Sequence, residues 1–168
     1  SSMVQEAEAS QKRINEFMKI ESEIKNTSND DLSFQSNITF KDVNFDYEDT
    51  NVRALNKLNL TINKGETVAI LGKTGSGKST LLTLLTRLYD VTDGSVLIDS
   101  KNIKDININQ LRSQIGMVPQ DTFLFSDSIK NNIKFGKANA TDEEVFAAAK
   151  NAMVHKDILN FKQQYETV

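Results

Sequence analysis

The stretch from Thr67 to Tyr89 constrains the fold of this chain more than any other part of it. It begins with four apolar residues, Val68–Leu71, which predict a short, fully buried strand. The sequence G-K-T-G-S-G-K-S follows at positions 72–79, and the leucines after it recur at the spacing of one helical face. We therefore expect a strand, a glycine-rich loop and a helix, in that order.

This order is the context that a P-loop requires. Glycines at 72, 75 and 77 lack a Cβ, so the backbone can curl and direct successive N–H groups inward. The first helical turn adds unpaired N–H groups and the positive end of the helix dipole, which together favour polyphosphate binding over an ordinary glycine-rich turn. Lys78 is expected to contact the β- and γ-phosphates, and the Ser79 hydroxyl to ligate Mg²⁺. The residues expected to contact the nucleotide from this loop are Gly72, Lys73, Thr74, Gly75, Ser76, Gly77, Lys78, Ser79 and Thr80.

Composition narrows the classes of function. The 168 residues are enough for one ordinary domain, and the net charge of −3, with both signs mixed, gives no basic field for nucleic acid. The absence of cysteine excludes disulfides and thiolate metal sites. No apolar run reaches the roughly 18 residues that a membrane helix needs, and no signal peptide is visible. The chain as given is therefore expected to be soluble.

Two segments precede the first strands. Residues 4–25 predict a charged helix with a narrow apolar stripe, and the polar residues 26–36 predict a linker. Residues 38–47 and 58–62 alternate between apolar and polar side chains, which predicts two antiparallel strands, with a bulge where the alternation in the first slips by one residue. Asn63-Lys64-Gly65 predicts the turn into the P-loop strand.

Shorter elements follow the P-loop helix. Ser95–Ile98 predicts a strand, and Lys101-Asn102 a tight hairpin turn; this turn makes Asp99 a poor candidate for the acidic end of a Walker B strand. Residues 109–115 predict a short helix and residues 116–120 a second buried strand. Residues 127–134 predict a helix capped by Asp127 or Ser128.

The last helix signal is a capping box. Thr141 stands at the N-cap position and Glu144 at N3, and the pattern predicts a helix that reaches Met153. The only histidine, His155, has no neighbouring ligand residues, so we expect it at a surface or a helix end rather than on a metal.

These features together resemble the nucleotide-binding domain of an exporter-type ABC transporter. Residues 9–17 are similar to the helix that leaves the last transmembrane segment, and Tyr47 is similar to the aromatic residue that stacks on adenine. G-M-V-P-Q at 116–120, followed by D-T-F-L-F-S, resembles the Q-loop, whose glutamine, here Gln120, contacts Mg²⁺ and the attacking water. The resemblance thus implies ATP and Mg²⁺ as cofactors, Lys78 and Gln120 as catalytic residues, and Ser79 and Gln120 as metal ligands.

The resemblance also implies an architecture and partners. The fold would be α/β, a P-loop NTPase core of ABC type with an N-terminal antiparallel β subdomain, incomplete at the C-terminus because the L-S-G-G-Q signature, a convincing Walker B strand and the switch histidine do not occur. Residues 1–25 would be the helical linker from the transmembrane domain, 26–36 a linker, and 37–168 the nucleotide-binding part. The implied partners are a transmembrane domain of the same or another chain and a second nucleotide-binding domain, at the cytoplasmic face of the cell membrane.

Other P-loop classes fit the sequence less well. A G protein would carry N-K-x-D, and the nearest match, Asn56-Lys57-Leu58-Asn59, ends in the wrong residue. A small kinase would place arginines in a lid, and neither Arg87 nor Arg112 lies in a recognisable one. A soluble ABC-type ATPase that acts as a mechanical module, and a nucleotide-binding fragment without turnover, remain alternatives. Because a Walker B strand is missing, we also expect that the strands that should flank the P-loop strand are absent, and that a strand edge or an apolar face of the core is left exposed.

Overall fold

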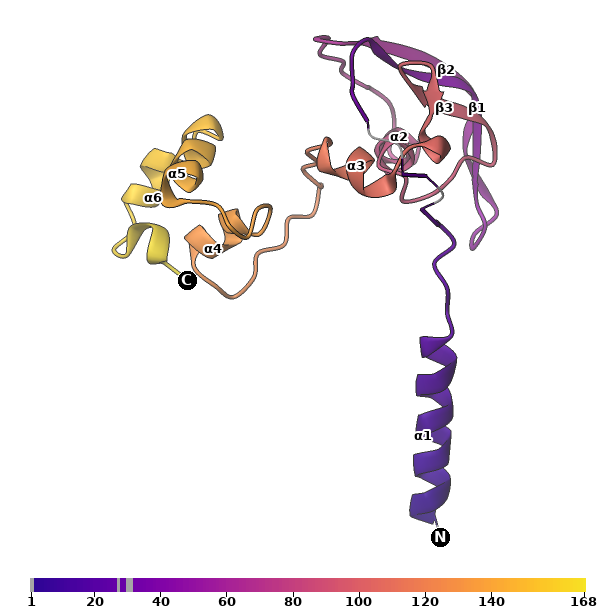
Figure 1. Cartoon of the computed structure of the whole chain (residues 1–168), viewed down its shortest axis with the longest axis horizontal. Coiled ribbons are helices and arrows are strands. Elements are labelled where there is room, and N and C mark those ends of the chain that lie inside the picture. The colour runs from indigo at the N-terminus through magenta and orange to yellow at the C-terminus, as the bar shows by residue number, and fades with distance from the viewer. Residues whose placement is uncertain (1, 27, 30–31) are drawn as a thin grey trace. The chain divides into compact units, whose positions relative to one another are not determined.

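The computed structural model describes residues 2–26, 28–29 and 32–168 (Figure 1). The chain divides into two compact units, Ser1–Gly116 and Met117–Val168, and each is described separately. The predicted linker at 26–36 is therefore described only in part, because positions 27, 30 and 31 lie outside the described residues.

The N-terminal helix is shorter than its sequence pattern predicts. Helix α1 spans Ser2–Met18, whereas the pattern extended to residue 25. The chain leaves the helix through two i→i−3 bonds, from Lys19 N to Glu16 O at 3.1 Å and from Ile20 N to Phe17 O at 3.2 Å. The apolar stripe is exposed, and Phe17 keeps 73% of its surface, so no packing extends the helix. Within the described residues, no helix is both long enough and apolar enough to cross a membrane.

A four-stranded antiparallel sheet forms the first unit's framework, in the order β2-β1-β3-β4. Its strands are β1 Asn37–Tyr47, β2 Val52–Asn63, β3 Asp93–Ile98 and β4 Lys101–Asn102. The two predicted antiparallel strands are confirmed, and so is the bulge, because the β1–β2 register shifts between Phe40 and Val43. At the bulge, Asp42 has a φ of 46°, and its backbone N–H donates to Asn59 Oδ1 at 3.0 Å.

The β3–β4 hairpin turns two residues earlier than predicted. Asp99 and Ser100 occupy the turn with φ values of 50° and 70°, while Lys101-Asn102 forms β4. Two consecutive left-handed residues are what a type I′ hairpin turn requires, and aspartate is among the non-glycine residues that tolerate this conformation. The hairpin itself is confirmed.

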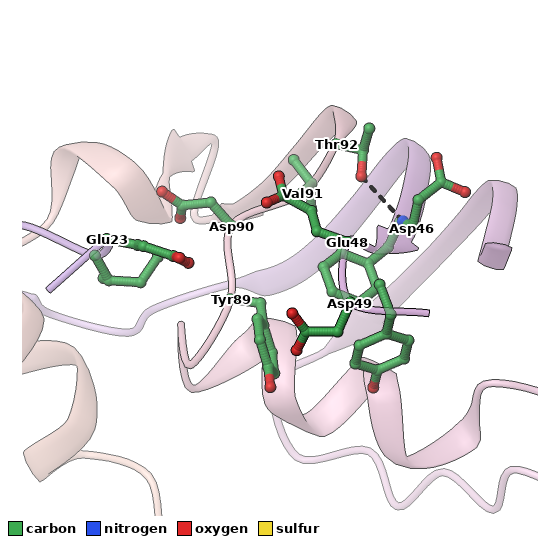
Figure 2. A pocket seen from close by; sticks show the side chains of 11 residues that line it. Glu23, Asp46, Glu48, Asp49, Tyr89, Asp90, Val91 and Thr92 are labelled. Atoms are coloured by element: carbon green, nitrogen blue, oxygen red, sulfur yellow. Dashed lines mark hydrogen bonds between the residues drawn. The ribbon is translucent and has the colours of Figure 1, made fainter. Parts of the chain in front are cut away.

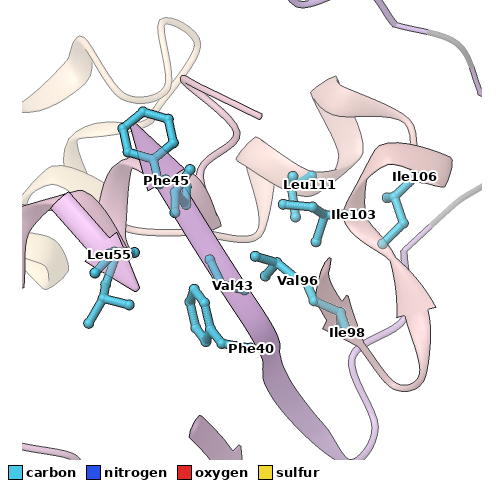
Figure 3. Close-up of a cluster of buried hydrophobic side chains, with 11 residues drawn as sticks. Phe40, Val43, Phe45, Leu55, Val96, Ile98, Ile103, Ile106 and Leu111 are labelled. Atoms are coloured by element: carbon cyan, nitrogen blue, oxygen red, sulfur yellow. The ribbon is translucent and has the colours of Figure 1, made fainter. Parts of the chain in front are cut away.

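The core of the first unit joins the sheet to the helices that follow the loop (Figure 3). Helix α2 spans Lys78–Leu85, η1 spans Ile103–Asp105 and α3 spans Ile108–Ser113. The predicted helices after the P-loop and at 109–115 are confirmed with small shifts at their ends. The buried cluster consists of Phe40, Val43, Phe45, Leu55, Leu81, Leu84, Val96, Ile98, Ile103, Ile106 and Leu111.

Two predicted buried strands are wrong. Residues 68–71 and 116–120 have no strand structure, and Leu71 and Val118 expose 93% and 86% of their surface. A buried strand needs hydrogen-bonded neighbours, and every strand pairing among the described residues lies within β1–β4. The two apolar runs have strand-like composition, but no described strand lies beside them.

The second unit is helical. It contains α4 Ile129–Lys134, α5 Asp142–Asn151, α6 His155–Leu159 and η2 Gln164–Glu166. The predicted caps are confirmed: Ser128, not Asp127, caps α4, and the Thr141–Glu144 capping box opens α5, which ends at Asn151 rather than Met153. His155 is the first residue of α6, where its Nδ1 lies 2.7 Å from Tyr165 Oη. The core of this unit is Val145, Ala149, Ile158 and Tyr165.

Candidate nucleotide-binding site

The glycine-rich loop adopts the conformation that its sequence predicts. Gly75 and Gly77 have φ values of 80° and 83°, a left-handed region that other residues enter at a cost. Between them, the backbone N–H of Ser76 donates to Lys73 O at 3.2 Å and closes a tight turn. Alternation of such conformations turns successive N–H groups towards one side, which is the geometry of an anion-binding nest.

The loop rests directly on strand β2. A Cβ on Gly77 would overlap the carbonyl oxygen of Ala54 and lie 2.9 Å from Leu55 Cδ2. A Cβ on Gly72 would lie 2.6 Å from Ser76 Oγ. Glycine is therefore required at position 77 for two reasons, its positive φ and its contact with β2. This contact fixes the loop relative to the sheet.

Helix α2 presents its N-terminus to the loop. Gly77 is the N-cap, and no side chain caps the first turn. Helix N-termini of this kind bind phosphate through unpaired N–H groups and the helix dipole. The Lys78 ammonium donates to Gly72 O at 2.9 Å and to Lys73 O at 2.8 Å, so it lies folded over the loop. A bound phosphate would compete with these two carbonyls for the same cation.

Tyr47 lies at the end of β1 next to this loop. Its hydroxyl is 3.2 Å from Thr80 Oγ1, a buried hydroxyl in the first turn of α2. Phe45 contacts the Tyr47 ring edge-on, with 4.8 Å between ring centroids. Tyr47 is therefore held by its hydroxyl contact with α2 and by ring contacts with Phe45 and Tyr89.

A pocket of about 270 Å³ lies between the tyrosine and the loop. The structure thus brings together Tyr47 and the predicted loop residues 75–80. Gly72, Lys73 and Thr74 belong to the same loop but do not line this pocket. Two residues that line the pocket, Val52 and Ala54, were not predicted from the sequence. The predicted strand began only at Leu58, whereas β2 begins at Val52. The apolar residues at 52, 54 and 55 are the signal that could have extended the predicted strand.

The sequence pattern that defines the ABC transporter family matches residues 55–166, which is two thirds of the chain. This chain belongs to the ABC transporter family. Its fold is the ABC nucleotide-binding fold, P-loop type and mixed α/β, with an antiparallel β subdomain, as the sequence predicted.

Relatives of this ABC domain are large fused proteins. It is 52% identical over 133 residues to proteins of Staphylococcus aureus strains NCTC 8325 and Mu50, whose names describe a multidrug export ATP-binding/permease protein. The match covers 79% of this chain and 23% of each relative. A bacterial Atm1-family ABC exporter, solved with ATP bound, superposes with a TM-score of 0.88 at 34% identity, over 98% of this chain and 29% of the other.

A second pocket of the ABC domain is also lined by Tyr47 (Figure 2). It is larger, about 430 Å³, and is lined by Tyr89, by Phe45 and by carboxylates, without a basic side chain. A polyphosphate would be repelled there, whereas the smaller pocket offers Lys78 and backbone donors. The smaller pocket therefore has the chemistry that suits a phosphate better than the larger one. The carboxylates of the larger one belong to Glu23, Asp46, Glu48, Asp49 and Asp90.

The donor set of the ABC domain fits Mg²⁺ as P-loop proteins bind it. Ser79 lies exposed in the first turn of α2 and lines the pocket. Across residues 2–26, 28–29 and 32–168, no three His, Cys, Asp or Glu residues gather as an independent metal site. Mg²⁺ in P-loop proteins takes few protein ligands and several phosphate and water oxygens, and the hydroxyl of the P-loop serine is one of those few.

Two other candidate residues of the ABC domain lie outside the pocket. Gln120 belongs to the second unit, where it is exposed in an irregular segment. Asp99 accepts hydrogen bonds from the backbone N–H groups of Gln35, Ser36 and Asn37 at 2.6, 2.6 and 3.0 Å. These bonds, the one from Gln35 first, lower the pKa of the Asp99 carboxyl below its ordinary value. Asp99 therefore holds the chain entering β1.

Proposed function

We propose that this chain is the ATP-binding part of an ABC exporter that couples ATP binding and hydrolysis to transport across a membrane. The observation that carries the proposal is the pocket that the P-loop and Tyr47 line together. The names of the relatives, which combine an ATP-binding part with a permease, and the ATP-bound exporter structure support it.

Each residue of the site has a role in this proposal. The N–H groups of the loop and of the first turn of α2 hold the phosphates, and Lys78 leaves its two carbonyl partners to bind the β- and γ-phosphates. Tyr47, held by Thr80, stacks on the adenine. Mg²⁺, when bound, would neutralise charge on the phosphate oxygens, and Ser79 and Gln120 are its proposed protein ligands.

We infer the chain's place in a larger assembly from the same relatives. Residues 1–25 would lead from a transmembrane domain, and residues 26–36 would connect them to the nucleotide-binding part at 37–168. A second nucleotide-binding domain would complete the site, at the cytoplasmic face of the membrane. The chain spans 23% of the length of the relatives cited above, so a permease of the same or another chain supplies the transport path.

The chain by itself should bind Mg·ATP and turn it over at or near background. Hydrolysis needs a group that orients or accepts the proton of the attacking water, and Asp99, the acid that follows a strand, is engaged with three backbone N–H groups instead. Phosphate release with this chain should therefore be near background, and Asp99→Asn should not change it. Robust turnover that Lys78→Ala and Asp99→Asn both abolish would contradict this proposal.

Competition between ATP and tripolyphosphate tests the nucleotide site. The wild-type chain should bind ATP more tightly, because only ATP has a base to stack on Tyr47. Tyr47→Ala should weaken ATP binding by about 1–3 kcal/mol, the usual worth of a base stacked on an aromatic ring, and leave tripolyphosphate binding unchanged. Phe161→Ala, which removes an exposed ring from the second unit, is the control and should bind ATP as the wild type does. Equal affinity of the wild type for the two ligands would refute stacking at Tyr47.

A further inference from the structure

Arg87 is a buried arginine just past the C-terminus of the P-loop helix. The residue is 3% exposed and has a φ of 52°, in the left-handed region, directly after the C-cap residue Thr86. Arginines are almost never fully buried unless they are paired, and a left-handed non-glycine residue persists only where its surroundings hold it. Both features indicate that the surrounding contacts fix Arg87 in place.

The guanidinium of Arg87 joins three segments. Its Nε donates to Asp90 Oδ1 at 3.0 Å, its Nη1 to Lys104 O at 3.4 Å, and its Nη2 to Lys25 O at 3.4 Å. Asp90 follows the helix, Lys104 lies in η1, and Lys25 lies in the segment that precedes the first strand. Arg87 is therefore the point where the end of α2 meets the lead segment, which we define as residues 25, 26, 28 and 29.

A second arginine fixes the backbone at the same place. Arg112, in α3, donates from Nε to Thr86 O at 3.0 Å and from Nη2 to Arg87 O at 2.8 Å. The carbonyls at a helix C-terminus lack partners within the helix and carry the negative end of its dipole, so a guanidinium is a fitting cap. Both arginines are thus used to hold the helix end.

The lead segment is also fixed to α3. Asn26 Oδ1 accepts from the backbone N–H of Ile108 at 3.1 Å, and Asn107 Nδ2 donates to Ser28 O at 3.2 Å. These bonds place the lead segment independently of Arg87. Loss of the Arg87 side chain should therefore remove the bonds of the helix end to Asp90, Lys104 and Lys25, while this second attachment and the bonds from Arg112 remain.

We propose that Arg87 is a positioning residue for nucleotide binding, and this inference rests on the proposed function. Helix α2 has eight residues and is about 12 Å long, so its ends move together. Its N-terminus supplies Lys78, Ser79 and the phosphate-binding N–H groups. By holding the C-terminus to Asp90, to Lys104 and to the lead segment, Arg87 sets the position from which these groups meet the phosphates.

Titration with a fluorescent ATP analogue and Mg²⁺ tests this role in three chains: the wild type, Arg87→Met and Arg87→Lys. Arg87→Met keeps an unbranched apolar side chain and removes its donors, so affinity should fall roughly 5- to 100-fold, the range typical of coupling between two sites. Arg87→Lys keeps a positive charge beside Asp90, so its affinity for the nucleotide should lie between those of Arg87→Met and the wild type. Ile98→Val, a mild core substitution in β3, controls for stability and should bind as the wild type does.

Hydrogen exchange without nucleotide gives a second readout. In Arg87→Met, amides of residues 82–88 and of Lys25 should exchange faster, while those of β1 keep wild-type protection. If Arg87→Met does not fold, Asp90→Asn removes only the charge of the ion pair and should weaken binding several-fold. Wild-type affinity and wild-type exchange in the folded variants would overturn the inference. Absence of binding by the wild type would instead refute the proposed function, and exchange would still test the role of Arg87.

Discussion

Gly77 carries two constraints, a left-handed φ and a backbone contact with Ala54, and they can be separated by substitution. Gly65 has nearly the same φ, 85°, but a Cβ there would meet nothing within 4 Å. Gly65→Ala therefore measures conformational strain alone, which costs about 1–3 kcal/mol at most. Gly77→Ala adds the overlap with β2.

We predict that Gly77→Ala lowers the free energy of unfolding more than Gly65→Ala does, and that it alone impairs ATP binding, since it displaces the loop from β2. Urea unfolding and nucleotide titration on both variants measure the difference. Equal losses of stability with unchanged affinity would show that the contact with β2 does not position the loop.

The Asp99 carboxylate should make the stability of the first unit depend on pH. Its pKa in the folded chain lies below the ordinary value of 3.8 because backbone N–H groups bind the ionised form. The stabilisation is therefore complete above about pH 5 and is lost as the pH falls through the lowered folded pKa. Asp99→Asn should be less stable than the wild type at neutral pH, and the difference should shrink on acidification.

The predicted loss of this stability difference at low pH is tested by urea midpoints of the wild type and of Asp99→Asn, measured from pH 7 down to pH 3. Asp49→Asn, a carboxyl without a hydrogen bond among the described residues, is the control and should follow the wild-type curve. A difference between wild type and Asp99→Asn that stays constant with pH would contradict the assignment.

At the scale of elements, the capping residues predicted where α4 and α5 begin. The Thr141–Glu144 box is formed, with Thr141 Oγ1 accepting from Glu144 N at 3.3 Å and Thr141 N donating to Glu144 Oε2 at 2.9 Å. Thr141→Ala should therefore destabilise α5 by about 1 kcal/mol. Thr122→Ala, outside any helix or strand, should change stability little. Thermal unfolding followed by circular dichroism measures both, and equal midpoints for the two variants would contradict the role of the box.

Strands could be predicted from sequence only where their partners are close in the chain. The β1–β2 pair and its bulge were predictable because the alternation lies within 26 consecutive positions, 38–63. The runs at 68–71 and 116–120 have strand-like composition, but burial depends on neighbouring strands, which a local pattern does not specify. The same limit applies to the site. The glycine-rich loop could be predicted from the local spacing of its glycines. The position of Val52 and Ala54 in the pocket and the hydrogen bond from Arg87 to Lys25 O depend on contacts between residues distant in sequence.

At the scale of the whole molecule, the exposed apolar runs at 68–71 and 116–120 should promote association between chains. Val68, Leu71 and Val118 expose 43%, 93% and 86% of their surface. Exposed apolar segments without paired backbone favour association between chains. We predict that the chain self-associates at micromolar concentration and that Leu71→Asn with Val118→Asn reduces the association. A monomer in sedimentation velocity, with a high melting temperature, would contradict this.

The central claim is that the loop at 72–79 holds the phosphates of ATP, and titration of Lys78→Ala with fluorescent Mg·ATP tests it most directly. Affinity should fall about 10- to 100-fold, because a hydrogen bond to a charged group is worth about 1.5–3 kcal/mol. Circular dichroism should show a folded chain, since the Lys78 ammonium contacts only loop carbonyls in the described structure. Lys41→Ala, which removes an exposed lysine from β1, should bind as the wild type does. Equal affinity of the wild type and Lys78→Ala would contradict the claim.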